Sequence, residues 1–351
     1  MKTFLKWFGL LLAVLVIAYL VGPTVQPGPV AENIPVVSTD LSVLETQISE
    51  SESKAGLKPD NQARIVWADS LHKQKTPYSL VYLPGFGASW AEGDPVHKQL
   101  AKHFGCNLYL GREFEHGVKS SDALKNLTPA TYTASAESAL AIGKALGEKV
   151  IVIGTSAGGM LTLYLAAHHP EIHGIVLYSP CIAVANPALK LVTRPWGKQI
   201  MDGIMGSEHV KVTHYQPDRA NYWLTQYHTN GLITLQTMLD KFMTPETFAK
   251  VKQPVFMGYY YKDEEHQDKV VSVPAMLEMF DQLGTPADKK QKMAFPESGD
   301  HVIASHFTSK DLNGVYQATA TFMAEVLGVK PAPAPRPNYT PTPTLALHPK
   351  K

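Results

Sequence analysis

Residues 149–158 have the sequence KVIVIGTSAG, and this stretch decides the fold of the chain. Its first five residues are mostly apolar and β-branched, which predicts a buried strand, and an apolar helical pattern follows from Ala157 toward His169. Between the two lies a G-x-S-x-G turn, whose small residues on either side of Ser156 let the strand and helix backbones approach closely. A serine on such a corner projects from the end of a sheet, near the positive end of the next helix. We therefore predict that Ser156 is a nucleophile.

Composition and charge argue against several classes of function. The 351-residue chain has a formal net charge of +1 and no long basic block, so nucleic acid is not an expected partner. It contains no C-x-x-C, H-E-x-x-H or calcium-loop motif, and we expect neither a metal nor another cofactor. Its two cysteines define no disulfide framework.

The N-terminal segment, residues 1–22, is predicted to be a signal anchor or a signal peptide. Lysines precede an apolar run from Trp7 to Val21, whose length lies between a signal-peptide core and a membrane span. Because Gly22-Pro23 is a poor cleavage junction, an uncleaved anchor is favoured over a removed peptide. In both cases the positive charges precede the run, which predicts an extracytoplasmic (periplasmic) catalytic domain, anchored to the membrane or, after cleavage, secreted.

Three further segments follow. Residues 23–60 are expected to form a proline-containing stalk with one short helix that Asp40 caps. Residues 61–328 are expected to form one domain, and residues 329–351 a proline-rich disordered tail that cannot pack a core.

Strands and helices alternate along the domain, which predicts a mostly parallel central sheet with helices on both faces. Two helices are expected to start at capping residues followed by proline, Asp94-Pro95 and Thr128-Pro129. Residues 181–252 interrupt the alternation with helical signals, and we expect them to form a cap over the sheet. The expected strands are residues 64–68, 78–83, 107–110, 149–153, 174–178, 254–261 and 293–295.

A serine hydroxyl needs a base to take its proton and a carboxylate to orient that base. Behind a G-x-S-x-G turn the expected chain order is serine, acid, histidine. His301 follows the last expected strand and is the predicted base. Asp263 and Asp268 both follow the preceding strand, and we prefer Asp268 as the acid because the valines and serine just after it anchor the loop ahead of the next helix.

The other predicted site feature is an oxyanion hole, which needs two backbone N–H groups. One is expected from Ala157, the residue after the nucleophile. The other is expected from Phe86 in the glycine-containing loop 84–89, because glycines let a backbone approach a ligand closely.

These motifs resemble the α/β-hydrolase superfamily, and within it the branch of monoacylglycerol lipases, lysophospholipases and carboxylesterases. The resemblance spans residues 65–327 and depends on residues 83–87, 112, 116–117, 154–158, 268–272 and 299–301. It implies an α/β-hydrolase fold with a helical cap, in which Ser156 attacks an ester, His301 relays its proton and Asp268 holds the imidazole. One departure is Pro84, where that branch usually has histidine, and it leaves open how the oxyanion loop is held.

The predicted function is hydrolysis of carboxylic esters, with small, lipophilic, monoacylglycerol or lysophospholipid substrates. Two alternatives remain: an acyltransferase that uses the same triad, and a membrane-anchored binding protein that has no catalytic activity. The cap is rich in aromatic residues and methionine, which would suit an acyl chain, although most of them are expected to build the core of the cap itself.

Overall fold

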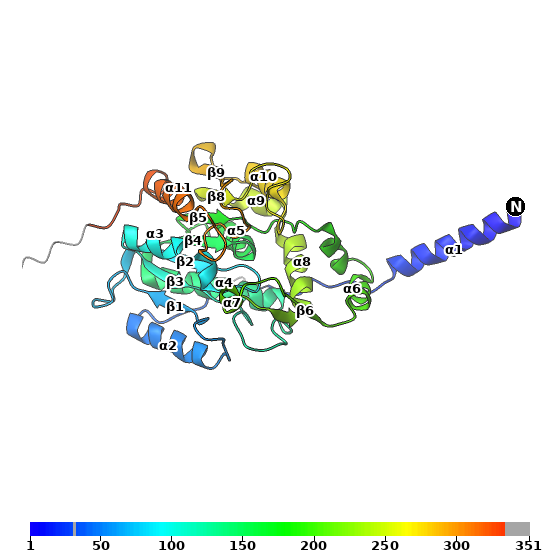
Figure 1. Cartoon of the computed structure of the whole chain (residues 1–351), viewed down its shortest axis with the longest axis horizontal. Helices are drawn as coiled ribbons and strands as arrows, with labels where there is room; N and C mark the ends of the chain where they lie inside the picture. The colour runs from blue at the N-terminus through cyan, green and yellow to red at the C-terminus, as the bar shows by residue number, and fades with distance from the viewer. Residues whose placement is uncertain (31–32, 334–351) are drawn as a thin grey trace, which may run out of the picture.

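A seven-stranded sheet forms the centre of the computed structural model, which describes residues 1–30 and 33–333 (Figure 1). The strand order is β1-β3-β2-β4-β5-β8-β9, and every neighbouring pair is parallel except β1 and β3. The prediction of a mostly parallel central sheet is confirmed. In chain order the strands are β1 (Arg64–Val66), β2 (Thr76–Leu83), β3 (Asn107–Leu110), β4 (Gly147–Thr155), β5 (Gly174–Tyr178), β8 (Val255–Tyr259) and β9 (Lys290–Ala294).

Helices cover both faces of this sheet. Successive side chains of a strand point to opposite faces, and β4 sends Val150 and Val152 into one core and Ile151 and Ile153 into the other. The first core includes side chains of α4, α5 and α10, and the second those of α3 and α11. The bounds of these helices are α3 (Val96–Phe104), α4 (Pro129–Leu146), α5 (Ala157–His168), α10 (Val273–Gln282) and α11 (Leu312–Glu325), with short 3-10 helices η1 (Trp90–Gly93) and η3 (Ala287–Lys289).

The chain between β5 and β8 leaves the sheet and returns to it. Its elements are η2 (Pro187–Thr193), α6 (Gly197–Met205), β6 (His209–Lys211), α7 (Pro217–Ala220), β7 (Gln226–His228), α8 (Asn230–Phe242) and α9 (Pro245–Lys250). Strands β6 and β7 form a separate antiparallel pair that helical signals did not predict. Strands of three residues are too short to show the alternation of a strand in the sequence.

The two proline-containing helix starts have different outcomes. Thr128 caps α4 as predicted, because its hydroxyl accepts from the Thr131 amide and the Thr131 hydroxyl accepts from the Thr128 amide. The prediction that Asp94 caps α3 is wrong. Helix α3 begins at Val96 with Pro95 in the capping position, and the Asp94 carboxylate instead pairs with Lys98 at 2.8 Å.

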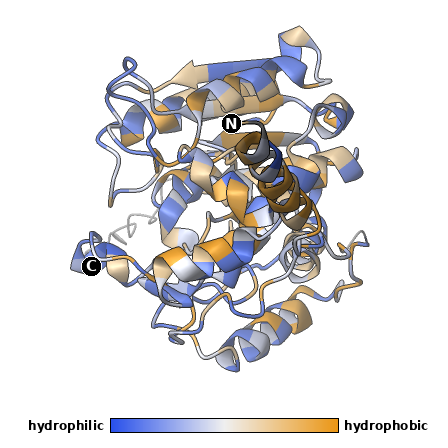
Figure 2. Cartoon of the chain, turned by 90° about the vertical axis from the view of Figure 1, so that its right-hand side faces the viewer, coloured by the Kyte–Doolittle hydropathy of each residue, from blue (hydrophilic) through white to orange (hydrophobic). Residues whose placement is uncertain are grey.

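The N-terminal helix α1 (Lys2–Leu20) projects away from the sheet and its helices (Figure 1), and Figure 2 colours most of it as hydrophobic. In the part of the chain that the structure describes, it is the one helix long and apolar enough to cross a membrane. Helix α2 (Leu41–Ser53) follows, and Asp40 caps it by accepting from the amides of Ser42 and Val43. Most of the proline-rich tail, residues 334–351, lies outside the described residues.

Candidate active site

Ser156 lies on the corner between β4 and α5, in a strained backbone conformation with φ 54° and ψ −117°. Two glycines make this corner possible. A Cβ atom on Gly158 would lie 2.0 Å from the carbonyl oxygen of Leu83, and one on Gly154 would lie 2.4 Å from the carbonyl oxygen of Gly158. No larger residue fits at either position without movement of the backbone, so the spacing of the motif follows from the close approach of β2, β4 and α5.

The end of β5 holds both Ser156 and His301 in place. The Ser156 amide donates to the carbonyl oxygen of Tyr178 at 2.9 Å, and the hydroxyl of the next residue, Ser179, donates to the carbonyl oxygen of His301 at 2.7 Å. Ser179 is fully buried and has a φ of 44°. Sequence analysis did not identify Ser179, because a serine at the end of a strand has no motif of its own.

His301 and Asp268 form a buried pair. The Nδ1 atom of His301 lies 2.5 Å from Oδ2 of Asp268, and both residues are almost fully buried. The other carboxylate oxygen accepts from the amides of Val270 and Val271 at 2.8 and 3.0 Å. These two backbone bonds fix the direction of the carboxylate, so that one oxygen is presented to the imidazole.

Asp263, the alternative acid, lies elsewhere. It is exposed, and its carboxylate accepts from the amides of Glu265 and His266 and contacts the His266 ring within its own loop. The structure therefore brings Asp268 to His301 and leaves Asp263 at the surface.

Burial and pairing shift the pKa values of the pair in opposite directions. Burial alone lowers the pKa of His301, but the charge and hydrogen bond of Asp268 outweigh burial and leave that pKa above 6.5. Burial raises the pKa of Asp268, and the positive charge of His301 with the two valine amides outweighs it, so the pKa ends below its usual range. The Nε2 atom of His301 has no hydrogen-bond partner among residues 1–30 and 33–333, and it is the ring nitrogen left for a reacting group.

The loop 84–89 approaches Ser156 from the end of β2. A Cβ atom on Gly85 would lie 3.0 Å from the Cβ atom of Ser156. Among the described residues the Phe86 amide has no acceptor, and Ala157 is the first residue of α5, where amides lack acceptors inside the helix. The Gly85 amide donates to the carboxylate of Glu92, a buried residue of η1 that the sequence analysis missed.

Aromatic residues of the chain between β5 and β8, the segment predicted to form a cap, pack against this loop. Trp223 packs with Ala88 and Val302, and the Tyr227 ring contacts the Phe86 ring edge-to-face with centroids 5.3 Å apart. The other apolar cap residues divide into two groups. Met238 and Phe242 belong to the main core beside the sheet and not to a separate core of this segment, whereas Trp196 and Met205 are exposed.

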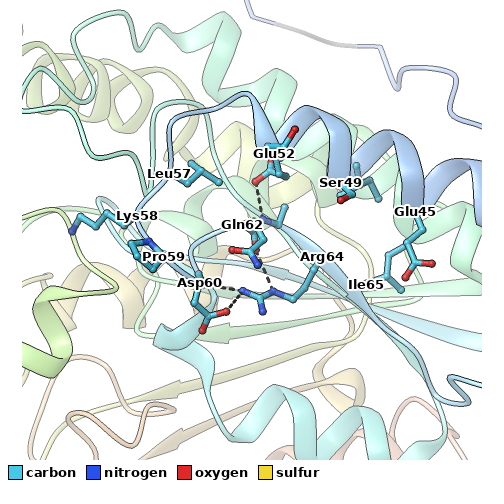
Figure 3. Close-up of a pocket in the computed structure, with 13 residues that line it drawn as sticks. Glu45, Ser49, Glu52, Leu57, Lys58, Pro59, Asp60, Gln62, Arg64 and Ile65 are labelled. Atoms are coloured by element: carbon cyan, nitrogen blue, oxygen red, sulfur yellow. Dashed lines mark hydrogen bonds and ion pairs between the residues drawn. The ribbon is translucent and has the colours of Figure 1, made fainter.

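A pocket of about 300 Å³ reaches His301 from the loops 260–270 and 299–301. The hollow drawn in Figure 3, about 620 Å³ between α2 and residues 57–65, shares no residue with the site. Its charged groups already pair with protein: Glu52 with Arg112, and Asp60 with Arg64. The described residues contain no group of three or more His, Cys, Asp or Glu that could hold a metal ion.

Comparisons with known proteins agree with this architecture. A model of the alpha/beta hydrolase family matches residues 80–325. A thermostable monoacylglycerol lipase from Bacillus sp. (strain H-257) is 33% identical over 109 residues, which are 31% of this chain and only 43% of the lipase. The match therefore spans less than half the length of that relative.

Two solved structures have the same fold at low sequence identity. One comes from work on the metagenome-derived lipolytic enzymes LipS and LipT, with a TM-score of 0.61, 16% identity, and coverage of 76% of this chain and 98% of that one. The other is the monoacylglycerol lipase of Paleococcus ferrophilus, with a TM-score of 0.54, 13% identity and coverage of 76% and 98%. Because the family model matches most of the chain and the fold agrees, this protein belongs to the alpha/beta hydrolase family.

Proposed function

We propose that the protein is a serine hydrolase of carboxylic esters, with Ser156 as nucleophile, His301 as general base and Asp268 as the acid that orients His301. The observation that carries the proposal is the buried Asp268–His301 pair at the same edge of the sheet as the strained Ser156 corner. Strain of this kind at a non-glycine residue concentrates at functional sites.

In the proposed reaction the Ser156 oxygen attacks the ester carbonyl carbon, and the Nε2 atom of His301 takes the hydroxyl proton. The tetrahedral intermediate then expels the alcohol, to which His301 returns that proton. Water, deprotonated in turn by His301, attacks the acyl-enzyme. Collapse of the second intermediate releases the carboxylic acid, and His301 returns the proton to the oxygen of Ser156. Asp268 stays ionised throughout and stabilises the imidazolium form of His301.

The proposed oxyanion hole consists of the amides of Phe86 and Ala157. Each amide without an internal acceptor can donate to an oxygen that becomes negatively charged in the transition state. The support for this pair is that both residues adjoin Ser156, one through Gly85 and one directly along the chain.

The substrate class that we propose is a lipophilic ester of small or medium acyl length, such as a monoacylglycerol or lysophospholipid. The support is the similarity to the Bacillus monoacylglycerol lipase and the aromatic residues of the cap above the loop 84–89. An acyl chain gains most of its binding free energy from contact with such apolar side chains.

We further propose that residues 1–22 anchor the protein in a membrane with the hydrolase domain, residues 61–328, outside the cytoplasm. Residues 23–60 would link the two, and residues 181–252 would form the cap. In support, the apolar side chains of α1 are exposed, and the indole N–H of Trp196 in the cap donates to the carbonyl oxygen of Ala18 at 2.9 Å. Next to Trp196 the apolar residues Ile200 and Ile204 of α6 are also exposed, which would suit contact with a lipid surface.

The test uses the full chain in detergent with p-nitrophenyl esters from acetate to laurate, beside Ser156→Ala, and with a fluorophosphonate probe. We expect hydrolysis and labelling by the wild type, both abolished in Ser156→Ala, and an optimum chain length that reports the size of the acyl site. Product analysis with added alcohol separates the alternatives, since a new ester in place of the free acid would identify an acyltransferase. A folded wild type with neither turnover nor labelling would instead support a binding protein.

A further inference from the structure

The loop 84–89 carries one proposed oxyanion donor, so its position relative to Ser156 matters for the rate. Backbone hydrogen bonds connect the loop to itself, to the chain between β5 and β8, and to η1. The Ala88 amide donates to the Gly85 carbonyl at 3.0 Å, the Leu224 amide to the Gly87 carbonyl at 2.7 Å, and the Glu92 amide to the Ser89 carbonyl at 3.1 Å. Pro84, at the start of the loop, has no N–H to donate. A side-chain bond joins the Gly85 amide to the carboxylate of Glu92.

Glu92 lies directly beneath this loop. Its side chain comes from η1 and the residue is only 3% exposed. The point where a Cβ atom of Gly85 would sit is 2.8 and 2.9 Å from the two carboxylate oxygens and 3.0 Å from the Cβ atom of Ser156. Gly85 therefore lies close to both Glu92 and the nucleophile, and a displacement of Glu92 would move the loop relative to Ser156.

We propose that Glu92 is a positioning residue of the active site, whose carboxylate holds the Gly85 amide so that the next amide, that of Phe86, points to the oxyanion. This inference rests on the proposed hydrolase function and adds to it the group that orients the oxyanion loop. Because an anionic acceptor makes a stronger bond to an amide than a neutral one, the carboxylate restrains the loop more tightly than an amide side chain would.

The ionisable groups around Glu92 come from several elements. They are His301, Arg219 of α7, Glu113 after β3, Tyr82 of β2, Tyr132 of α4 and Tyr215 of the cap. Burial raises the pKa of Glu92 to about 7, against the lowering effects of the Gly85 amide, His301 and Arg219. Glu92 in turn raises the pKa of His301, after the larger effects of burial, which lowers it, and of Asp268, which raises it.

A second buried glutamate provides a matched control. Glu113 is only 1% exposed, and burial raises its pKa to about 8. It differs from Glu92 in that its Oε2 atom has no hydrogen-bond partner in the described part of the chain, whereas the carboxylate of Glu92 accepts from the Gly85 amide. A general cost of replacing a buried carboxylate should therefore appear in both residues, and a positioning role only in Glu92.

The test compares Glu92→Gln, Glu92→Leu, Glu113→Gln and Glu113→Leu in the full chain, with kcat, KM and the melting temperature as readouts. Glu92→Leu removes the acceptor of the Gly85 amide, and we expect kcat to fall on the order of 10²-fold with KM nearly unchanged, the size of losing one oxyanion donor. Glu92→Gln keeps a weaker, neutral acceptor, so we expect a kcat between those of the wild type and Glu92→Leu, again with KM nearly unchanged. Both Glu113 variants should leave kcat within about threefold of the wild type.

The proposal is overturned if folded Glu92→Leu has the kcat of Glu113→Leu. Should Glu92→Leu fail to fold, the two glutamine variants decide the matter: we expect Glu92→Gln to have a lower kcat than Glu113→Gln, and equal kcat values would overturn the proposal. Absence of turnover and fluorophosphonate labelling in the wild type would overturn the hydrolase function itself, whereas an active wild type with indistinguishable Glu92 and Glu113 variants would overturn only the role of Glu92.

Discussion

Two regions of the molecule hold their side chains in different ways. One is the edge of the sheet where β4, β5 and β8 end, and the other is the segment 187–205 between β5 and β8. Ser156, Asp268 and His301 are all under 9% exposed and are fixed by backbone hydrogen bonds from separate elements. In the cap segment, Ile200 is 52% and Ile204 is 81% exposed. The groups proposed for the chemistry are therefore buried and held by hydrogen bonds, whereas Ile200 and Ile204 are exposed.

The difference indicates that rate and substrate access depend on different forces. At the sheet edge, position is set by hydrogen bonds and close packing, so small changes should affect kcat or folding strongly. In the cap, exposed apolar area has little effect on the stability of the fold and would matter when a lipid surface covers it. The following predictions test this contrast, beginning with the largest expected effect.

Replacement of the two candidate acids should separate the buried edge from the surface. Asp268→Asn removes the negative charge that faces His301 and no longer favours the imidazole tautomer that carries its proton on Nδ1. We therefore expect kcat to fall by about 10⁴-fold. In Asp263→Asn only contacts within an exposed loop change, and we expect kcat within about twofold of the wild type. Steady-state hydrolysis of a soluble p-nitrophenyl ester measures both, and equal losses in the two variants would contradict the assignment.

Alanine at two glycines should give opposite effects on stability. At Gly158 the new Cβ would lie 2.0 Å from the Leu83 carbonyl oxygen, and we expect a loss of about 3 kcal/mol or more in the free energy of unfolding. At Gly203, in α6 of the cap, nothing lies within 4 Å, and alanine should stabilise the protein by roughly 0.5–1 kcal/mol through helix propensity. Thermal and denaturant unfolding of the full chain measure both changes. An unchanged free energy of unfolding in Gly158→Ala would contradict the close packing of the corner at Ser156.

The pH dependence of activity should follow the buried pair. Because the pKa of His301 is raised and the base acts in its neutral form, we expect kcat/KM to fall with decreasing pH around a midpoint above 6.5. The contribution of His301 to the stability of the fold has the opposite trend, whereas the contribution of Asp268 falls with decreasing pH. The raised pKa of His301 contributes stability that is complete below pH 6.5 and lost as pH rises through the folded pKa, and the lowered pKa of Asp268 contributes stability that is lost as pH falls below 3.8 through its folded pKa.

The control for this prediction is a histidine–aspartate pair between the cap and the loop before α4. His209 lies 2.5 Å from Asp122, and both side chains are partly exposed. His209→Gln should leave the midpoint of the acid limb unchanged. A midpoint at or below 6.5 in the wild type, or one that moves in His209→Gln, would contradict the assignment of the limb to His301.

The smallest expected effect concerns the exposed apolar face of the cap. Ile204→Ser should change the free energy of unfolding by less than about 0.5 kcal/mol, because the side chain is exposed. It should lower hydrolysis of an ester embedded in anionic vesicles by roughly two- to threefold and leave a soluble ester unaffected, since only the first reaction needs contact with lipid. Leu71→Ser, at an 86% exposed leucine in the loop before β2, should change neither rate. Equal rates for Ile204→Ser and wild type on vesicles would remove the support that α6 gives to membrane contact.

Much of the fold follows from local patterns in the sequence. The apolar strands, the G-x-S-x-G corner and the capping box of Thr128 are features of neighbouring residues, and they predict the mostly parallel sheet and the start of α4. Predictions from local patterns were wrong where a side chain has another partner or where a strand depends on pairing with a separate segment. Asp94 is a good capping residue by type, but Lys98 takes its carboxylate, and β6 and β7 are strands only because each pairs with the other.

The sequence by itself determined the strand–turn–helix corner at Ser156 and left two aspartates for His301, because chain order and spacing constrain only neighbouring residues. The tertiary structure decided that Asp268 contacts His301, 33 residues away, through the direction that the valine amides impose on its carboxylate. It also decided that Glu92 takes the Gly85 amide and that Ser179 holds His301. Such contacts depend on where separate strands end relative to one another, and that relation exists only after the sheet has assembled.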